Sequence, residues 1–297
     1  MLRIAAEALV ALLLFGCIPV VVRTISANPY TIGIFRLAVA TTVVAAVLAG
    51  RGSLRRLPPR DLGRLAIIGV LFFAHWMTLF FAIKASSASI AAIGQSTYGV
   101  HLLILAALFV DHRARRTDIV AVILAVMGAI LVVPRFTFGN GIAVGMLLAT
   151  VSAFFYATLP LLHQRWSHIP TPLRTLGQFG FALLCFTFFI HKTVWTLAAR
   201  DWAGLLFLAV AVTLVAHTLW VRVTTQLAPS LTSIIYYGQI PVAIALGVLL
   251  LDEPLAPRTI VGALLIIAGS VLGLASRARQ SHVAPHSLQR QRPEIRK

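Results

Sequence analysis

Acidic side chains are scarce in this sequence, and their scarcity limits the chemistry it can perform. Eight of the 297 residues are Asp or Glu, and Glu7 is the only one that lies within an apolar run. The apolar runs therefore lack the paired carboxylates that serve general acid–base catalysis. The His-Glu-x-x-His and Gly-x-Ser-x-Gly motifs of metalloproteases and serine hydrolases are missing too. We predict no enzymatic activity, no metal site and no cofactor.

Cysteine is also rare, and no segment of the chain is continuously basic. Cys17 and Cys185 both lie inside apolar runs, where cysteine behaves as a small hydrophobic residue, so we expect no disulfide framework. The net charge of +17 comes from arginines between the apolar runs and in the C-terminal tail. That distribution is typical of membrane topology and argues against nucleic-acid binding.

Apolar residues dominate the rest of the sequence. They make up 59% of the chain against 11% charged residues, and the mean hydropathy is +0.93, which indicates a polytopic membrane protein. A helix needs about 20 apolar residues to cross a hydrocarbon core of ~30 Å. This length predicts ten membrane-spanning helices, at residues 5–24, 30–50, 62–84, 88–110, 118–134, 141–163, 172–194, 202–226, 229–251 and 258–276.

The basic residues predict how these spans are oriented. An even number of spans places both ends of the chain on one side of the membrane. Eighteen Lys and Arg residues fall on that side and six on the other. Cytoplasmic loops carry the excess of positive charge in membrane proteins. We therefore expect cytoplasmic N and C termini.

The second half of the sequence repeats the first at an offset of 141 residues. Without a gap, the offset aligns Asp111 with Asp252 and Gly128 with Gly269, and it also aligns Pro19 with Pro160. Apolar matches are frequent in membrane proteins, but prolines, an aspartate and a glycine in phase are not expected by chance.

Each copy holds five spans, so the second copy enters the membrane from the opposite side. Such inverted repeats build many secondary transporters around a central cavity. The predicted fold is an all-α polytopic membrane protein, with two inverted five-helix repeats around a central cavity. We place the first repeat at 1–135, the second at 136–276 and a basic, disordered cytoplasmic tail at 277–297.

Polar side chains recur three, four or seven residues apart in several spans, and this spacing places them on one helix face. By contrast, the fifth and tenth spans have almost no polar side chains, so we place them at the rim, toward lipid or the second subunit of a homodimer. The stripes are His75 and Thr78 beside Trp76; Gln95, Tyr98 and His101; Ser152, Tyr156 and His163; Thr213, His217, Trp220 and Thr224; and Ser233, Tyr236 and Gln239 beside Tyr237.

The convergence of these stripes from both repeats predicts a substrate cavity. Taken singly, each residue is open to a second interpretation as a hydrogen-bonded packing residue. His75 and His217 lie in equivalent spans and are candidates either for proton transfer or for neutral packing. Arg36 is costly in a membrane unless it pairs with a substrate carboxylate or a helix C-terminus. The predicted cavity residues are Arg36, His75, Trp76, Gln95, Tyr98, Tyr156, His217, Trp220, Tyr236, Tyr237 and Gln239.

Together these features resemble the EamA family of the drug/metabolite transporter superfamily. The resemblance rests on the ten spans, on Pro29 and Arg36 at the start of the second span, and on the turn Asp252-Glu253-Pro254-Leu255 before the last one. It covers residues 5–276. It implies an inner-membrane exporter or exchanger of amino acids, other metabolites or toxic compounds, with a central cavity.

We therefore expect a secondary active transporter that exports a small metabolite such as an amino acid by alternating access. The expected partners are that small molecule and the lipid bilayer. A passive channel is the alternative interpretation, and an intramembrane enzyme using histidines is a more remote one.

Overall fold

The computed structural model describes residues 2–54, 57–109, 116–132, 141–227 and 235–281. Within these ranges the regular structure is entirely helical. The helices are α1 (Leu2–Thr24), α2 (Pro29–Gly50), α3 (Pro59–Ala85), α4 (Ala88–Gln95), α5 (Tyr98–Phe109), α6 (Arg116–Val132), α7 (Gly141–Arg165), α8 (Thr171–Thr187), the 3₁₀ turn η1 (Ile190–Lys192), α9 (Ala199–Phe207), the π-helix η2 (Leu208–His217), α10 (Thr218–Gln226), α12 (Gln239–Leu251) and α13 (Pro257–Ser281).

These elements confirm the predicted class, because the described residues fall into ten membrane-crossing segments. The fourth segment is made of α4 and α5, and the eighth is made of α9, η2 and α10. Among the described residues, five continuous helices are long and apolar enough to cross a membrane, and shorter apolar helices account for other segments. Ser233 and the turn that begins at Asp111 lie outside the described residues.

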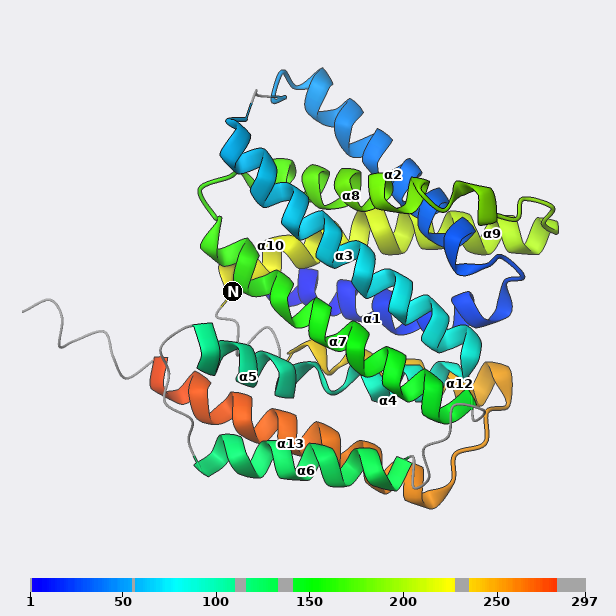
Figure 1. Cartoon of the computed structure of the whole chain (residues 1–297), viewed down its shortest axis with the longest axis vertical. Coiled ribbons are helices and arrows are strands. Elements are labelled where there is room, and N and C mark those ends of the chain that lie inside the picture. The colour runs from blue at the N-terminus through cyan, green and yellow to red at the C-terminus, as the bar shows by residue number, and fades with distance from the viewer. Residues whose placement is uncertain (1, 55–56, 110–115, 133–140, 228–234, 282–297) are drawn as a thin grey trace, which may run out of the picture.

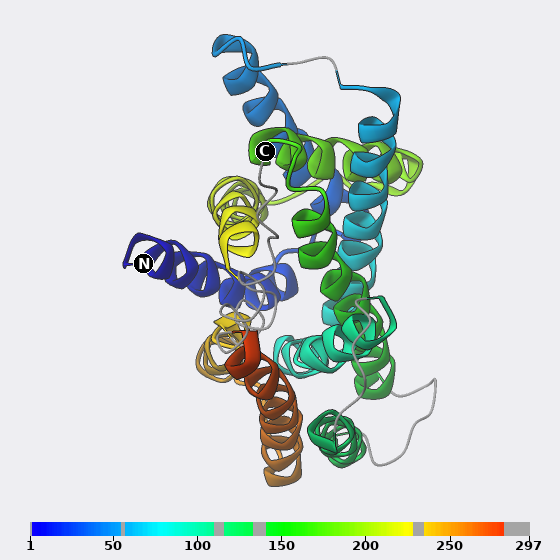
Figure 2. The same cartoon turned by 90° about the vertical axis from the view of Figure 1, so that its left-hand side faces the viewer.

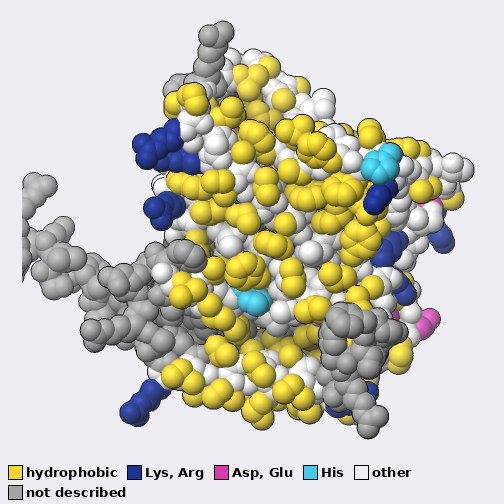
Figure 3. All heavy atoms as spheres, in the orientation of Figure 1, with side chains coloured by type: hydrophobic (Ala, Val, Ile, Leu, Met, Phe, Trp, Pro, Cys, Tyr) yellow, Lys and Arg dark blue, Asp and Glu magenta, His cyan; other side chains and the backbone are white. Residues whose placement is uncertain are grey.

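The segments run roughly across the view of Figure 1, with most connections at its left and right ends. We call the end at which α1 begins and α13 ends the terminal side, and the other end the opposite side. Apolar side chains cover the face seen in Figure 3, while Lys and Arg gather toward the two ends. This distribution matches a hydrocarbon layer between two polar interfaces.

The first helix occupies the middle of the bundle. It packs against α3 and α4 of the first repeat and against α12, η2 and α10 of the second. The end-on view of Figure 2 shows α1, in dark blue, reaching in between these elements. Side chains of α1 therefore face residues from both halves of the sequence.

The fifth and tenth segments, α6 and α13, pack on each other at the lower edge of Figure 1. Glycines permit this close approach, since a Cβ atom at Gly128 would lie 2.4 Å from the Gly262 carbonyl oxygen. Outer side chains such as Ile123 and Leu264 are exposed, as expected for helices at the rim. This surface is available to lipid or to the predicted second subunit.

Two segments end at residues other than those predicted, and a third contains an unexpected type of helix. The helix predicted to reach residue 194 ends at Thr187. Beyond it, the backbone oxygens of Lys192 and Val194 accept hydrogen bonds from Asn28 and Thr31 at the start of α2, at 2.7 and 3.1 Å. The last helix continues to Ser281, five residues past the predicted end of the tenth span at residue 276. The eighth segment includes a π-helix that hydropathy does not reveal.

Candidate substrate-binding cavity

A cavity lies between the two repeats at the centre of the bundle. Its walls come from α1, α2, α3, α4, α7, η2 and α12, together with Tyr236. Its volume is about 30 Å³, which is room for roughly two water molecules. Eight of the eleven predicted cavity residues line it: Arg36, His75, Trp76, Gln95, Tyr156, His217, Tyr236 and Gln239.

Two broken helices meet at this cavity, one from each repeat. The fourth segment is interrupted at Ser96 and Thr97, whose hydroxyls donate to the carbonyl oxygens of Ile93 and Gly94, at 2.6 and 2.8 Å. Such local side-chain bonds compete with the helical pattern. The ninth segment is interrupted at residues 237–238. The offset of 141 residues aligns these two positions with Ser96 and Thr97.

The breaks place two helix N-termini at the cavity level. One is the start of α12 at Gln239, and the other is the start of α5 at Tyr98. Helix N-termini carry a partial positive charge and unpaired N–H groups, so they attract anionic groups. Discontinuous helices at the midplane are a recurrent way for transporters to build substrate sites.

A hydrogen-bonded cluster joins α3, α4 and α7 at the cavity wall. The Ser152 hydroxyl lies 2.7 Å from Nδ1 of His75 and accepts a bond of 3.1 Å from Nε2 of Gln95. The His75 ring stacks on Tyr156, with 4.4 Å between ring centroids. The cluster fixes one side of His75 and leaves Oε1 of Gln95 buried without a partner among the described residues.

Arg36 is fully buried, and its guanidinium is only partly bonded. Nε donates to the Thr213 hydroxyl at 2.9 Å, and the guanidinium carbon lies 4.0 Å from the centroid of the Trp76 ring. Thr213 in turn donates to the carbonyl oxygen of Leu208, five residues earlier in the π-helix, at 2.8 Å. The widened helix therefore holds the acceptor that orients Arg36.

Several polar atoms around the central cavity have no hydrogen-bond partner among the described residues. They are Nη1 and Nη2 of Arg36, Oε1 of Gln95, Nε2 of His217 and Nε1 of Trp220. No carboxylate is among the residues that line the cavity, so the charge of Arg36 has no counter-ion there. Buried polar groups are almost always paired, and a buried charge is costly without a partner. These atoms are available to bind a solute.

Tyr98, Trp220 and Tyr237 lie just outside the main cavity. The Tyr98 ring contacts Tyr236, with centroids 4.7 Å apart. Trp220 lines a smaller neighbouring cavity of about 10 Å³ with His217. The Tyr237 hydroxyl accepts a hydrogen bond of 2.8 Å from the backbone N–H of Gly99, so it braces the broken fourth segment against the ninth.

Sequence reasoning missed the apolar part of the wall. Phe15, Phe80 and Ile18 line the cavity, and the Phe15 ring lies 4.7 Å from that of His217. In the sequence these residues cannot be told from side chains that face lipid, because the cavity was predicted from stripes of polar residues and apolar side chains do not contribute to such stripes. Only Pro19 in the same wall, as an in-helix proline, marks this part of α1 in the sequence.

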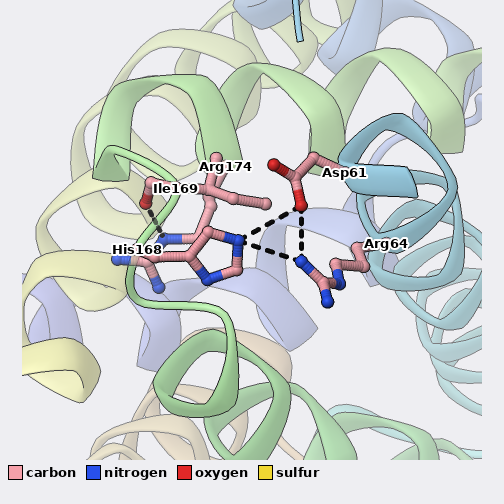
Figure 4. Close-up of polar contacts among 5 residues, drawn as sticks. All are labelled: Asp61, Arg64, His168, Ile169 and Arg174. Atoms are coloured by element: carbon pink, nitrogen blue, oxygen red, sulfur yellow. Dashed lines mark hydrogen bonds and ion pairs between the residues drawn. The ribbon is translucent and has the colours of Figure 1, made fainter. Parts of the chain in front are cut away.

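A cluster of side-chain bonds joins α3 to the loop between α7 and α8 on the terminal side. Asp61 and Arg64 of α3 pair at 2.5 Å, and Asp61 lies 3.1 Å from Nε2 of His168 in the loop between α7 and α8. Nε2 of His168 is also 3.0 Å from Arg64, and it donates to the carboxylate or accepts from the guanidinium, according to its protonation. Arg174, 1% exposed, donates to the Ile169 carbonyl oxygen at 2.9 Å (Figure 4).

A separate set of bonds lies on the opposite side. The Asp201 carboxylate at the start of the eighth segment accepts bonds from the backbone N–H and the hydroxyl of Ser26, after α1. Arg23 of α1 donates to the carbonyl oxygen of Lys84 at 2.8 Å. Different residues thus form the polar contacts on the two sides of the bundle.

Comparison with known proteins agrees with the two-repeat helical fold. The model of the EamA-like transporter family matches the chain twice, over residues 3–133 and 143–274. An uncharacterized transporter of Clostridium kluyveri is 21% identical over 241 residues, which cover 75% of this chain and 76% of the relative. A protein of known crystal structure superposes with a TM-score of 0.65 at 16% identity, covering 94% of this chain and 98% of its own. The similarity to this crystal structure is a similarity of fold.

Proposed function

The chain belongs to the EamA-like transporter family and is a membrane transporter, and from this premise we propose that it exports a small metabolite such as an amino acid by secondary active transport. The observation that carries the substrate proposal is Arg36, a fully buried arginine with two unpartnered nitrogens at the wall of the central cavity.

Arg36 favours a solute that carries a carboxylate. A guanidinium binds a carboxylate through two parallel hydrogen bonds, and Nη1 and Nη2 are the two nitrogens left free here. The helix N-terminus at Gln239 supplies further positive potential. The solute's charge would compensate the buried charge of Arg36, so binding would remove an energetic penalty.

The rest of the wall favours an apolar or aromatic body with hydrogen-bonding ends. Rings of Trp76, Tyr156 and Tyr236 line the cavity beside Gln95 and His217, whose free polar atoms would orient the solute. With its present volume of about 30 Å³ the cavity admits water only. The solute would therefore enter only when the bundle opens on the terminal side or on the opposite side.

The separate sets of bonds on the terminal side and on the opposite side support alternating access. Breaking the Asp61 cluster would open the terminal side, and breaking the contact of Ser26 with Asp201 would open the opposite side. In transporters with inverted repeats, alternating access is largely a rocking of one repeat against the other around a fixed site. The excess of basic residues supports a cytoplasmic terminal side, and export would then proceed from the terminal to the opposite side of the inner membrane. The proposed homodimer would use the outer faces of α6 and α13.

Flux in proteoliposomes tests this function. Vesicles containing the purified protein are loaded with a panel of radiolabelled amino acids and other monocarboxylates, and release is followed with and without unlabelled solute outside. Accelerated exchange in the presence of outside solute supports alternating access, whereas uniform release points to a channel. His217→Ala should reduce flux at least tenfold, and Arg165→Ala, at an exposed site far from the cavity, should not. Absence of flux for every solute in the panel would contradict the proposed substrate class.

A further inference from the structure

A groove much larger than the central cavity lies on the terminal half of the molecule, between α2, α8 and the η2–α10 segment. Its volume is about 720 Å³. Val43 and Val47 at its edge are 37% and 45% exposed, and Leu48 and Leu214 line it more deeply. Because this part of α2 lies within a predicted span, the exposed valines face hydrocarbon, and the groove opens to lipid.

The terminal end of the same groove is polar and positively charged. Arg51 and Arg222 line it there, next to the first residues of α8. Arg222 pairs with Glu7 at 3.3 Å, and Glu7 also pairs with Arg3 at 3.1 Å. Two arginines thus share one carboxylate, and Arg51 has no ion pair among the described residues, so this end of the groove keeps an excess of positive charge.

Two hydroxyl groups in the groove are buried without a partner among the described residues. They belong to Thr175, which is 1% exposed, and to Thr218. Both residues line the groove. Unpaired buried hydroxyls are uncommon, and here they occur beside a helix N-terminus, which favours anions. A ligand that is anionic at one end would satisfy the hydroxyls and the arginines together.

We propose that this groove binds one anionic phospholipid. Its headgroup phosphate would lie against Arg51, Arg222 and the N-terminus of α8, and an acyl chain would lie along Val47 and Leu214. The apolar wall lies at the depth of the hydrocarbon and the charged end lies toward the terminal side, which matches the positions of the acyl chain and the headgroup in a phospholipid. Anionic lipids are concentrated in the cytoplasmic leaflet, on the side where the basic residues of this chain place the terminal side.

A neighbouring groove shows what the charged end adds. It lies along α8 from Leu173 to Leu184, and leucines, Phe181 and two glycines line it without any charged side chain. Hydrocarbon of any lipid fits such a surface. The groove between α2 and α8 differs by its two arginines and its two free hydroxyls, so it selects the headgroup as well as the chain.

Native mass spectrometry of the purified protein tests this site, with phosphatidylglycerol and phosphatidylcholine of identical chains added in detergent. We expect one phosphatidylglycerol to remain bound at activation energies that remove phosphatidylcholine. Arg51→Ala combined with Thr175→Val should weaken retention of phosphatidylglycerol about tenfold. Arg165→Ala removes an exposed arginine from the same side but outside the groove, and should leave retention unchanged.

Three results would overturn the proposal: equal retention of the two lipids, full retention in the Arg51→Ala, Thr175→Val variant, or displacement of the lipid by glycerol 3-phosphate at matched concentration. The last result would show a site for a soluble phosphate. Arg51 is exposed, so Arg51→Ala alone is the variant to use if the double variant does not fold. The measurement does not depend on solute transport.

Discussion

The Glu253 carboxylate caps the fourth segment by accepting the backbone N–H of Ser89 at 2.8 Å, and its second oxygen accepts that of Ala88 at 2.7 Å. Glu253 follows α12 in the second repeat, and Ala88 and Ser89 are the first two residues of α4 in the first. The acidic turn that marks the end of the repeat in the sequence is therefore a contact between the two repeats.

Replacing Glu253 should destabilise this contact. Glu253→Gln keeps the shape but loses the charge and one of the two acceptors, so we expect a loss of about 1–3 kcal/mol in stability, measured by thermal unfolding in detergent. Asp252→Asn is the matched control, because Asp252 has a left-handed backbone (φ 49°) that asparagine also tolerates. An unchanged melting temperature for Glu253→Gln would show that the cap contributes nothing.

Arg36→Gln should separate transport from stability. We expect at least a tenfold loss of flux, since the paired donors for a carboxylate disappear, together with an equal or higher melting temperature, since an uncompensated buried charge is removed. Flux in proteoliposomes and thermal unfolding of the same preparation measure both effects. Normal flux in this variant would exclude Arg36 as the anchor of the solute.

Adding a methyl group between α6 and α13 should force the helices apart. A Cβ atom at Gly262 would lie 2.6 Å from the Gly128 carbonyl oxygen, too close for any rotamer change to relieve, so Gly262→Ala should cost roughly 1–3 kcal/mol. At Gly63 a Cβ atom would meet nothing within 4 Å, and Gly63→Ala should be neutral or stabilising. Equal melting temperatures for the two variants would contradict the close packing.

Removing the polar contacts on one side of the bundle should expose the cavity to that side. In a background of Cys17→Ala and Cys185→Ala, a cysteine replacing the cavity residue Ile18 reports access of a membrane-impermeant thiol reagent. Asp201→Ala should speed labelling several-fold from the opposite side, because it removes the acceptor for Ser26. Asp61→Ala should do so from the terminal side. Labelling that increases from both sides in either variant would indicate a channel or an unfolded bundle.

Much of the architecture was predictable because it follows from hydrophobic length and charge. Ten apolar runs, the repeat of Asp111 at Asp252, and Pro29 and Arg36 in the second span led to the family and to the helical fold that the comparisons and the structure confirm. The cavity residues remain predictions as regards function. The structure places eight of these eleven residues on the wall of the central cavity, because polar stripes in a membrane must turn away from lipid.

Other features could not be read from the sequence. The phenyl ring of Phe15 could face lipid or a cavity equally well by composition, and only the position of α1 between the repeats decides. The π-helix that places Thr213 beside Arg36 depends on packing of η2 against α1 and α2. The break at Ser96 has a local signal in its hydroxyl side chains, but Ser and Thr also occur in unbroken membrane helices.

The sequence by itself determined that this chain crosses the membrane ten times in two related halves and that polar residues of both halves avoid lipid, because burial of apolar length and exclusion of unpaired polar groups are properties of each segment alone. Only the tertiary structure decided which of those groups find partners. Ser152 is satisfied by His75 and Gln95, whereas the outer nitrogens of Arg36 are left free. That difference depends on distances between segments far apart in the chain, and no local pattern encodes it.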